Sequence, residues 1–343
     1  MLRSLLIAAV TLGLLSTTAC HRRRYHYETV VAPPPAPEAP AHQLAATGAG
    51  RALSRVTSDP IDELMPAISP SGDVVLFETR VWQNRALTQQ TIVGVDPETG
   101  ATRTMYTSQN AKSSAPTWVA DGSSFIFASD SSGRPSIVKS MAAQPNAAIS
   151  VIAGGDAAPN PGHPTVSPDG TRVAFHADIR GKTSIVVIGT DGSRLTILGE
   201  GQRPAWSPDG KRLAFSRRVG EYSQLFLVNA DSGTNLVQLT NDLADNDNPA
   251  WSPNGKIVLF NSNRGWDRAG SARDAVWNLF AIKSDGTGLI QVTDGNADSG
   301  SPMWGRDGWI YFHSNQAGNY DVWRLHPAGD FEALGTAAPA ARR

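Results

Sequence analysis

The amino-acid sequence predicts an all-β fold: a six-bladed β-propeller of four-stranded antiparallel blades whose ring is closed by an N-terminal strand. Three observations lead to this prediction. One phrase recurs along the chain, its copies are regularly spaced, and no stretch of the repeats shows a convincing helical period. A fixed phrase that returns at long intervals indicates a repeat architecture.

The recurring phrase is clearest in RPAWSPDGKRLAFS, which starts at Arg203. Two close copies are NPAWSPNGKIVLFN and HPTVSPDGTRVAFH, and three looser ones are SPMWGRDGWIYFHS, APTWVADGSSFIFAS and MPAISPSGDVVLFET. Their prolines lie 40 to 53 residues apart, at Pro66, Pro116, Pro164, Pro204, Pro249 and Pro302. Because a four-stranded propeller blade needs roughly 40–50 residues, each copy predicts one blade.

Each copy also contains the parts of a blade. A strand ending in Trp206 leads into the SPDG turn, where Pro208 presets φ and Gly210 supplies the left-handed position. RLAFS, QLFLVN and LVQLT follow as the second, third and fourth strands. They are apolar on both faces, as expected for a sheet that neighbouring blades cover on both sides. The phrase proline suits the start of an edge strand, which in a propeller faces the central channel.

Two features of the repeats bear on the core and on ring closure. One position of the phrase holds Trp118, Trp206, Trp251 and Trp304, with Ile68 and Val166 in two copies, and we expect packing between blades there rather than an aromatic cage. ALSRVT, from Ala52 to Thr57, resembles the fourth-strand segments LVQLT and LIQVT and is predicted to be the outermost strand of the last blade. FEALG, from Phe331 to Gly335, competes for the same place.

The N-terminal residues predict an exported protein. A short basic start precedes LLIAAVTLGLL, which is too short to span a bilayer comfortably, and STTAC follows. This stretch resembles the lipobox of bacterial lipoproteins, although Thr17 stands where leucine is usual, and it predicts a signal peptide over 1–19 with Cys20 lipidated. The alternative is an ordinary cleaved signal. Cys20 is the only cysteine of the chain, and lipidation explains a thiol that would otherwise be unpaired.

The segments that flank the propeller are expected to lack a core. Residues 20–50 contain HRRRYHY and APPPAPEAPAH and read as an extended, proline-rich tether, with arginines placed beside anionic headgroups. The propeller is predicted over 51–335, and 336–343 read as a disordered tail. His21 after Cys20 favours sorting to the outer membrane, because aspartate there is the familiar inner-membrane retention signal in enteric bacteria.

WSPDGKRLAF and its copies resemble the repeats of the TolB-type six-bladed propeller, over about Arg51 to Gly335. TolB carries a small α/β domain before its propeller, whereas here a proline-rich stretch stands in that place, so we expect a TolB-like lipoprotein. The resemblance implies the periplasmic side of the bacterial envelope. It also implies a partner class: a peptidoglycan-associated lipoprotein or another Tol component.

Candidate binding residues lie on the variable face, which carries the loops between second and third strands and the links between blades. Arginines and aromatic residues dominate interface hot spots, and these segments contain both types. The candidates are Trp82, Arg85, Arg217, Arg218, Tyr222, Arg264, Trp266, Arg268 and Arg273. We expect an interaction site for a protein or peptide, with Trp266 the strongest single candidate.

A second set of candidates surrounds the channel mouth. Repeat symmetry places the residues before the phrase prolines in one ring: Met65, Ala115, His163, Arg203, Asn248 and Ser301. His163, Arg203 and Asn248 are its chemically versatile members. The acidic links SDPIDEL, NDLADNDN and DGNADSGS lead to the same mouth. Asp242, Asp245 and Asp247 could hold calcium, but their spacing lacks the glycine and distal glutamate of a recognised calcium loop.

Enzymatic readings find less support in the sequence than a binding module. There is no G-x-S-x-G nucleophile elbow, and the histidines His163, His176, His313 and His326 form no close metal-binding pair. A formal net charge of −1 gives no general attraction to nucleic acid. We therefore predict a monomeric, non-enzymatic module without a cofactor. The alternative is a propeller that binds glycans or processes polysaccharides with a metal.

Overall fold

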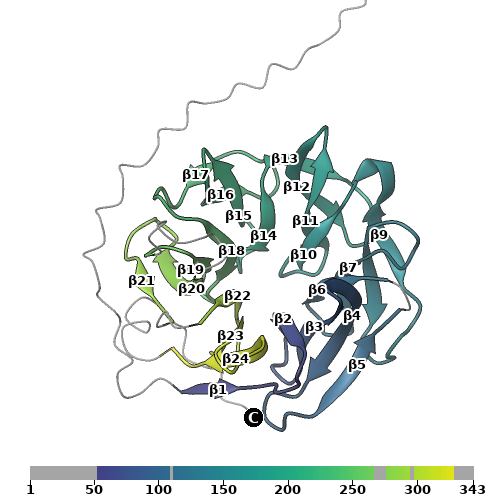
Figure 1. The fold of residues 1–343 in the computed structure, drawn as a ribbon. Helices are drawn as coiled ribbons and strands as arrows, with labels where there is room; N and C mark the ends of the chain where they lie inside the picture. Colours follow the sequence, from purple (N-terminus) through teal and green to yellow (C-terminus); the bar gives the residue numbers. More distant parts are fainter. Residues whose placement is uncertain (1–51, 109–110, 266–275, 294–296, 328–343) are drawn as a thin grey trace, which may run out of the picture. The chain divides into compact units, whose positions relative to one another are not determined.

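The computed structural model describes residues 52–108, 111–265, 276–293 and 297–327 of the 343-residue chain. These residues form six four-stranded antiparallel sheets, and the one helix among them is the 3-10 turn Gly155–Ala157. The predicted six-bladed propeller is therefore confirmed. Figure 1 shows the six sheets around a centre, with strands β2, β6, β10, β14, β18 and β22 innermost.

The first three blades follow one another along the chain, and each begins with its innermost strand. Blade 1 contains β2 (Asp62–Ile68), β3 (Val75–Gln83), β4 (Ala86–Val95) and β5 (Thr102–Tyr106). Blade 2 contains β6 (Ser113–Trp118), β7 (Ser124–Ser129), β8 (Ser136–Met141) and β9 (Ser150–Gly154). Blade 3 contains β10 (Gly162–Val166), β11 (Arg172–Ile179), β12 (Lys182–Gly189) and β13 (Thr196–Glu200).

The remaining blades repeat this order, but the sixth takes its outer strand from the N-terminal side. Blade 4 contains β14 (Gln202–Trp206), β15 (Arg212–Val219), β16 (Tyr222–Asn229) and β17 (Val237–Gln238). Blade 5 contains β18 (Asn246–Trp251), β19 (Ile257–Ser262), β20 (Asn278–Lys283) and β21 (Ile290–Gln291). Blade 6 contains β22 (Ser299–Trp304), β23 (Ile310–Ser314), β24 (Asp321–Leu325) and β1 (Leu53–Arg55).

Strand β1 closes the ring as predicted, because it pairs antiparallel with β24. Thr57, just beyond β1, accepts a hydrogen bond from the backbone N–H of Val322 at 2.9 Å. Thr240 accepts the equivalent bond from Leu225 in blade 4, and Thr293 from Leu279 in blade 5. RVT, QLT and QVT are therefore alike because the threonine of each accepts the same backbone hydrogen bond from the third strand of its blade. The competing segment FEALG lies outside the described residues.

The hydrophobic core is divided among the junctions between blades. Six clusters of buried apolar side chains each contain residues from two neighbouring blades, including the pair formed by blades 6 and 1. Trp118, Trp206 and Trp251 are buried, and each indole donates a hydrogen bond to a backbone carbonyl of the preceding blade. Core packing of the repeated tryptophans is thus confirmed.

The antiparallel order gives the ring two faces. The first-to-second and third-to-fourth turns, including SPDG, emerge on one side, which we call the turn face. The second-to-third hairpins and the links between blades emerge on the other side, which we call the loop face. Several turn glycines lie against the SPDG-type turn of the preceding blade: Gly210 lies beside Pro168, and Gly255 beside Pro208. Regular packing therefore accounts for the uniform turn face.

Candidate binding site at the channel mouth

A cavity of about 550 Å³ lies along the centre of the ring. All six innermost strands line it, from the residues before the phrase prolines at the loop face to Pro70, Pro168, Pro208 and Pro253 at the turn face. Its volume falls within the range of roughly 300–1,000 Å³ that is usual for small-ligand pockets. The predicted ring of pre-proline residues does line this one cavity.

Each of the six pre-proline residues adopts a left-handed backbone conformation. Their φ values range from 46° to 56°, at Met65, Ala115, His163, Arg203, Asn248 and Ser301. The pairing of each innermost strand with its neighbour is irregular at this point. Left-handed non-glycine residues are uncommon, and such bulges re-aim backbone and side-chain groups. A sixfold repeat of the bulge therefore shapes the channel mouth.

The preceding blade supplies acceptors for several of these bulges. Glu78 Oε2 accepts a hydrogen bond from the backbone N–H of Ala115 at 2.8 Å. His176 Nδ1 accepts a longer one from Arg203 at 3.4 Å, and His313 Nδ1 one from Met65 at 3.5 Å. The three acceptors occupy the same repeat position, directly after the phenylalanine of the second strand. One set of side chains thus ties blade 1 to 2, blade 3 to 4, and blade 6 to 1.

The imidazoles of His176 and His313 require glycine opposite them. A Cβ on Gly162 would lie 2.8 Å from His176 Nε2, and one on Gly300 would lie 2.9 Å from His313 Nε2. Since Nδ1 acts as acceptor in both histidines, the neutral rings carry their proton on Nε2. In both histidines the acceptor nitrogen, Nδ1, therefore binds a backbone N–H group, and the donor nitrogen, Nε2, makes none of these backbone contacts.

His163 completes the group of histidines. Its ring lies 5.1 Å from that of His176, and its Nε2 atom is buried without a hydrogen-bond partner among the described residues. Burial is the main reason that the pKa of His176 falls to about 4, that of His313 to about 3, and that of His163 well below its usual value. All three imidazoles are therefore neutral at neutral pH.

Two arginines are each held by a carboxylate: Arg203 lines the cavity, and Arg80 lies close enough to the mouth to lower the pKa of His163. Arg203 pairs through Nη1 with Asp247, whose other oxygen accepts bonds from the Ser216 hydroxyl and the backbone of Asn248. Arg80 donates from Nε to Glu78 at 2.8 Å and also pairs with it through Nη2. Burial raises the pKa of Glu78, and its contact with Arg80 opposes that rise. Each arginine side chain remains 31% exposed.

The expected second-to-third loops are mostly strand. Trp82 lies within β3, and the turn to β4 consists of Asn84 and Arg85, both with positive φ. Arg217 and Arg218 belong to β15, and Tyr222 begins β16. The strands of both hairpins stay paired up to a two-residue turn, at Gln83–Ala86 in one and Val219–Tyr222 in the other. The second-to-third connections of blades 1 and 4 are therefore shorter than the expected loop segments, and the candidate residues lie on the loop face as predicted.

The residues on these hairpins differ in exposure. Trp82 is 51% exposed and donates its indole N–H to Asp62 at 3.2 Å. Arg85 and Arg218 are exposed, whereas Arg217 lies over the Phe226 ring at 5.6 Å. Their part in partner binding stays a prediction.

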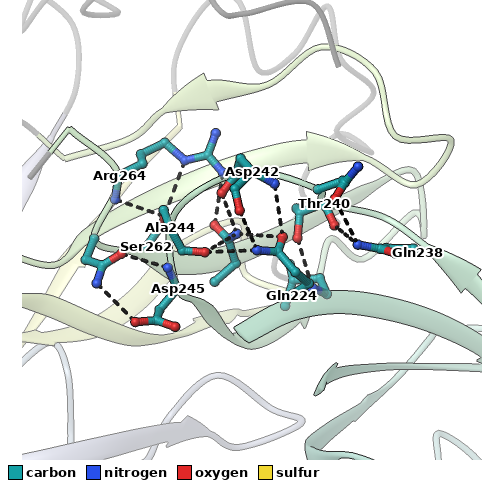
Figure 2. A network of polar contacts seen from close by, with 12 residues as sticks. Gln224, Gln238, Thr240, Asp242, Ala244, Asp245, Ser262 and Arg264 are labelled. Carbon is teal, nitrogen blue, oxygen red and sulfur yellow. Dashed lines mark hydrogen bonds and ion pairs between the residues drawn. The ribbon is translucent and has the colours of Figure 1, made fainter. Parts of the chain in front are cut away.

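Arg264 is engaged in a polar network at the junction of blades 4 and 5 (Figure 2). Its Nη2 donates to Asp242 at 2.7 Å and to Asn246 at 2.9 Å, and its guanidinium lies 4.8 Å from the Phe280 ring centre. The side chain is only 19% exposed. Arg264 therefore organises the NDLADNDN link, and its role in partner binding stays a prediction.

The same network occupies the carboxylates that were considered for calcium. Asp242 accepts from Arg264, Asp245 accepts from the backbone of Ser223, and Asp247 pairs with Arg203. Within the described parts of the chain, no three His, Cys, Asp or Glu side chains are grouped so that they could hold a metal ion. Calcium at these aspartates is not supported by this arrangement.

Several predicted residues lie outside the described residues: Cys20, Trp266, Arg268 and Arg273. Conversely, Arg80 and Glu78 were missed by reasoning from sequence. The sequence did contain a signal for this site. In each blade, one residue directly follows the phenylalanine of the second strand, and around the ring these residues are Glu78, Ala128, His176, Ser216, Asn261 and His313. Comparing the copies at that position would have predicted a polar ring below the pre-proline residues.

Fold and channel together define the described part of the chain as a six-bladed β-propeller with a central, polar-mouthed pocket. The family model of the TolB beta propeller domain (PD40) matches residues 163–270, which belong to blades 3, 4 and 5. A comparison with the curated proteins found no match. Among the described residues, no helix is both long and apolar enough to cross a membrane.

Solved structures with a similar fold include TolB proteins and an enzyme. Putative TolB from Agrobacterium tumefaciens has a TM-score of 0.58 and 21% identity, over 70% of this chain and 85% of that one. TolB from Acinetobacter baumannii has a TM-score of 0.56 and 17% identity, over 80% of this chain and 63% of that one, less than two thirds of its length. The gluconolactonase XC5397 from Xanthomonas campestris has a TM-score of 0.59 and 14% identity, over 80% and 89%. At these identities the likeness concerns the fold.

Proposed function

We propose that this protein is a non-enzymatic binding module of the bacterial cell envelope, which captures a protein or peptide partner on its loop face and channel mouth. The observation that carries the proposal is the channel mouth itself: Arg203 lines an open pocket, and the buried carboxylates of Asp247 and Glu78 hold Arg203 and Arg80 in place. The TolB-type repeats support the same class of function. Pre-positioned arginines with exposed aromatic neighbours are typical of interface hot spots.

Location and anchoring form part of the proposal. We infer export through the signal over residues 1–19 and lipidation of Cys20, with the propeller held on the periplasmic side, most simply at the outer membrane. A peptidoglycan-associated lipoprotein or another Tol component is the proposed partner class, and the protein acts as a monomer. Cys20→Ser is expected to move the protein from the membrane fraction to the soluble fraction, which cell fractionation measures.

Capture from envelope extract tests the binding function. The bait is the purified full-length protein, and the test variant combines Trp82→Ala with Arg218→Ala, on blades 1 and 4 of the loop face. A matched control combines Leu195→Ala with Lys211→Ala, one apolar and one basic residue on the turn face. A protein retained by wild type and control but lost by the test variant supports the proposal. Equal capture by all three proteins argues against it.

A second candidate is a sugar-directed enzyme, favoured by the fold likeness to a gluconolactonase and by three histidines near the mouth, of which His163 lines the cavity. Two of those histidines use Nδ1 as an acceptor for backbone N–H groups, which leaves no lone pair on either neutral ring for a metal. This arrangement favours the binding module. Metal analysis of the purified protein, followed by lactone hydrolysis and pectin-fragment cleavage assays, decides between the two.

A further inference from the structure

The polar groups of the channel mouth share one chemical property, which the proposed function leaves open: they present hydrogen-bond donors. His176 and His313 use their acceptor nitrogens on the backbone of Arg203 and Met65, so each neutral ring carries its proton on Nε2, which faces Gly162 in one case and Gly300 in the other. His163 adds a buried Nε2 atom without a partner among the described residues. Buried polar atoms normally have a hydrogen-bond partner, so an unpaired one at the wall of a pocket indicates that a bound ligand supplies the partner.

The two arginines add charged donors to the same place. Arg203 lines the cavity and spends Nη1 on Asp247, while Arg80 spends Nε and Nη2 on Glu78. A guanidinium carries five N–H donors, so both retain donors beyond these pairs. Both arginines lower the pKa of His163 and of His313, so the four groups lie near one another, and Arg203 and His163 line the cavity itself.

The two carboxylates that pair with these arginines, Glu78 and Asp247, also accept hydrogen bonds from other groups. Glu78 receives the backbone N–H of Ala115 in addition to Arg80, and Asp247 receives Ser216 and Asn248 in addition to Arg203. These bonds orient the carboxylates toward the blade junctions and thereby hold the arginines in position. Charged hydrogen bonds to a carboxylate are about twice as strong as neutral ones.

We infer that the channel mouth binds a carboxylate group of an acidic peptide, with Arg203, Arg80 and His163 as the recognising donors. A carboxylate only accepts hydrogen bonds, and this mouth chiefly donates them. The inner cavity beyond it is lined by prolines and by parts of the buried tryptophans, which suits the short apolar portion of a peptide. This inference rests on the proposed function, because it specifies the ligand chemistry of the same mouth.

Binding of defined peptides to the full-length protein tests the inference. The first probe is an acetylated, amidated pentapeptide of alanines with one central glutamate, and its twin has glutamine there. A third probe is acetylated tetra-alanine with a free terminal carboxylate, which separates side-chain from terminal recognition. By isothermal titration, the glutamate or terminal-carboxylate peptide is expected to bind at least tenfold more tightly than the glutamine twin.

Variants locate the binding at the mouth. Arg203→Gln is expected to remove the preference for carboxylate, whereas Arg103→Gln, on the exposed outer strand of blade 1, should retain it. His163→Ala gives a second test, since the Nε2 atom of His163 has no hydrogen bond to lose in the folded state. Equal binding of glutamate and glutamine peptides, or a preference that survives both Arg203→Gln and His163→Ala, overturns the inference.

The two proposals fail in distinguishable ways. Capture of an envelope protein without any preference for carboxylate would remove the inference and leave the binding module intact. Carboxylate binding at the mouth, together with no captured protein, would instead remove the proposed function and leave a site for small acids.

Discussion

Two junctions of the ring use the same positions for opposite chemistry. At the junction of blades 4 and 5, Gln224 on the third strand meets Asn246 on the next innermost strand. At the closing junction of blades 6 and 1, those positions hold Asp321 and Glu63, as the pairing registers show. Neutral amides thus occupy an internal junction, and two carboxyl groups occupy the seam.

The amide junction is fully satisfied (Figure 2). Gln224 donates to the carbonyls of Asp242 and Ala244, and Asn246 donates to Gln224 and accepts from Arg264. An amide both donates and accepts, so two of them can meet without any change of protonation. This junction does not depend on pH through its central pair.

The carboxyl junction depends on a proton. Glu63 is fully buried, and neither of its oxygens has a hydrogen bond of normal geometry among the described residues. Burial, with a smaller effect from Asp59 and Asp321, raises the pKa of Glu63 to about 8, and the Thr57 hydroxyl offsets part of this rise. Arg55 neutralises Asp321 at 2.8 Å, where an internal blade has Gln238 in the place of arginine. The seam therefore combines one ion pair with one neutral acid.

The repeat therefore fixes where two neighbouring blades touch, but the residue types at that contact differ from one junction to another. The seam adjoins the blade in which the first and last described strands, β1 and β24, pair, and its chemistry differs from that of the Gln224–Asn246 junction. The following changes test this contrast.

The largest effect is expected from Arg264→Ala at the amide junction. It leaves Asp242 and Asn246 without their shared donor, and breaking a largely buried ion pair costs about 3 kcal/mol. Urea unfolding measures the loss. Lys182→Ala, which breaks the exposed pair with Glu200, is the control and should cost less than about 1 kcal/mol. Similar losses in the two variants would contradict the role given to the network.

Glu63→Gln is expected to flatten the pH dependence of stability at the seam. The pKa of Glu63 is about 8 in the folded state against 4.5 for a solvent-exposed glutamate, so the unfolded chain releases a proton that the folded chain keeps. Wild-type stability therefore falls as pH rises from 4.5 through 8, by about 3 kcal/mol at pH 7 from this group. Glutamine lacks this loss, so the variant gains on wild type as pH rises. Parallel stability profiles of the two proteins would refute this.

A smaller change is expected from Asp321→Asn and from Asp59→Asn. Each removes a negative charge near Glu63 and lowers its pKa, but burial remains and keeps that pKa above 4.5. Carbon NMR of the Glu63 carboxyl group measures the titration. A return of the pKa to 4.5 in either variant would show that charge, and not burial, dominates.

The smallest effect on stability belongs to Leu243→Ser, in the link that Arg264 supports. The Leu243 side chain is 83% exposed, so the free energy of unfolding should change by less than about 0.5 kcal/mol. A melting curve checks this. Unchanged stability with weaker partner capture would add Leu243 to the binding surface, whereas a large loss of stability would show that the link is more tightly packed than its exposure indicates.

The sequence by itself determined the six blades, the strand that closes the ring and the placement of the repeated tryptophans between blades. The recurring turn residues and the strands that are apolar on both faces encode these features locally. RVT before the first blade matched QLT and QVT for the same local reason.

Only the tertiary structure decided the chemistry of the channel mouth and of the seam. The left-handed bulge at Arg203, the neutral state of His176 and the proton on Glu63 each depend on groups from another blade. Those groups lie one blade away along the chain, or at its opposite end for Glu63 and Asp321. Burial then sets their protonation, because a buried charge costs free energy that an exposed one does not.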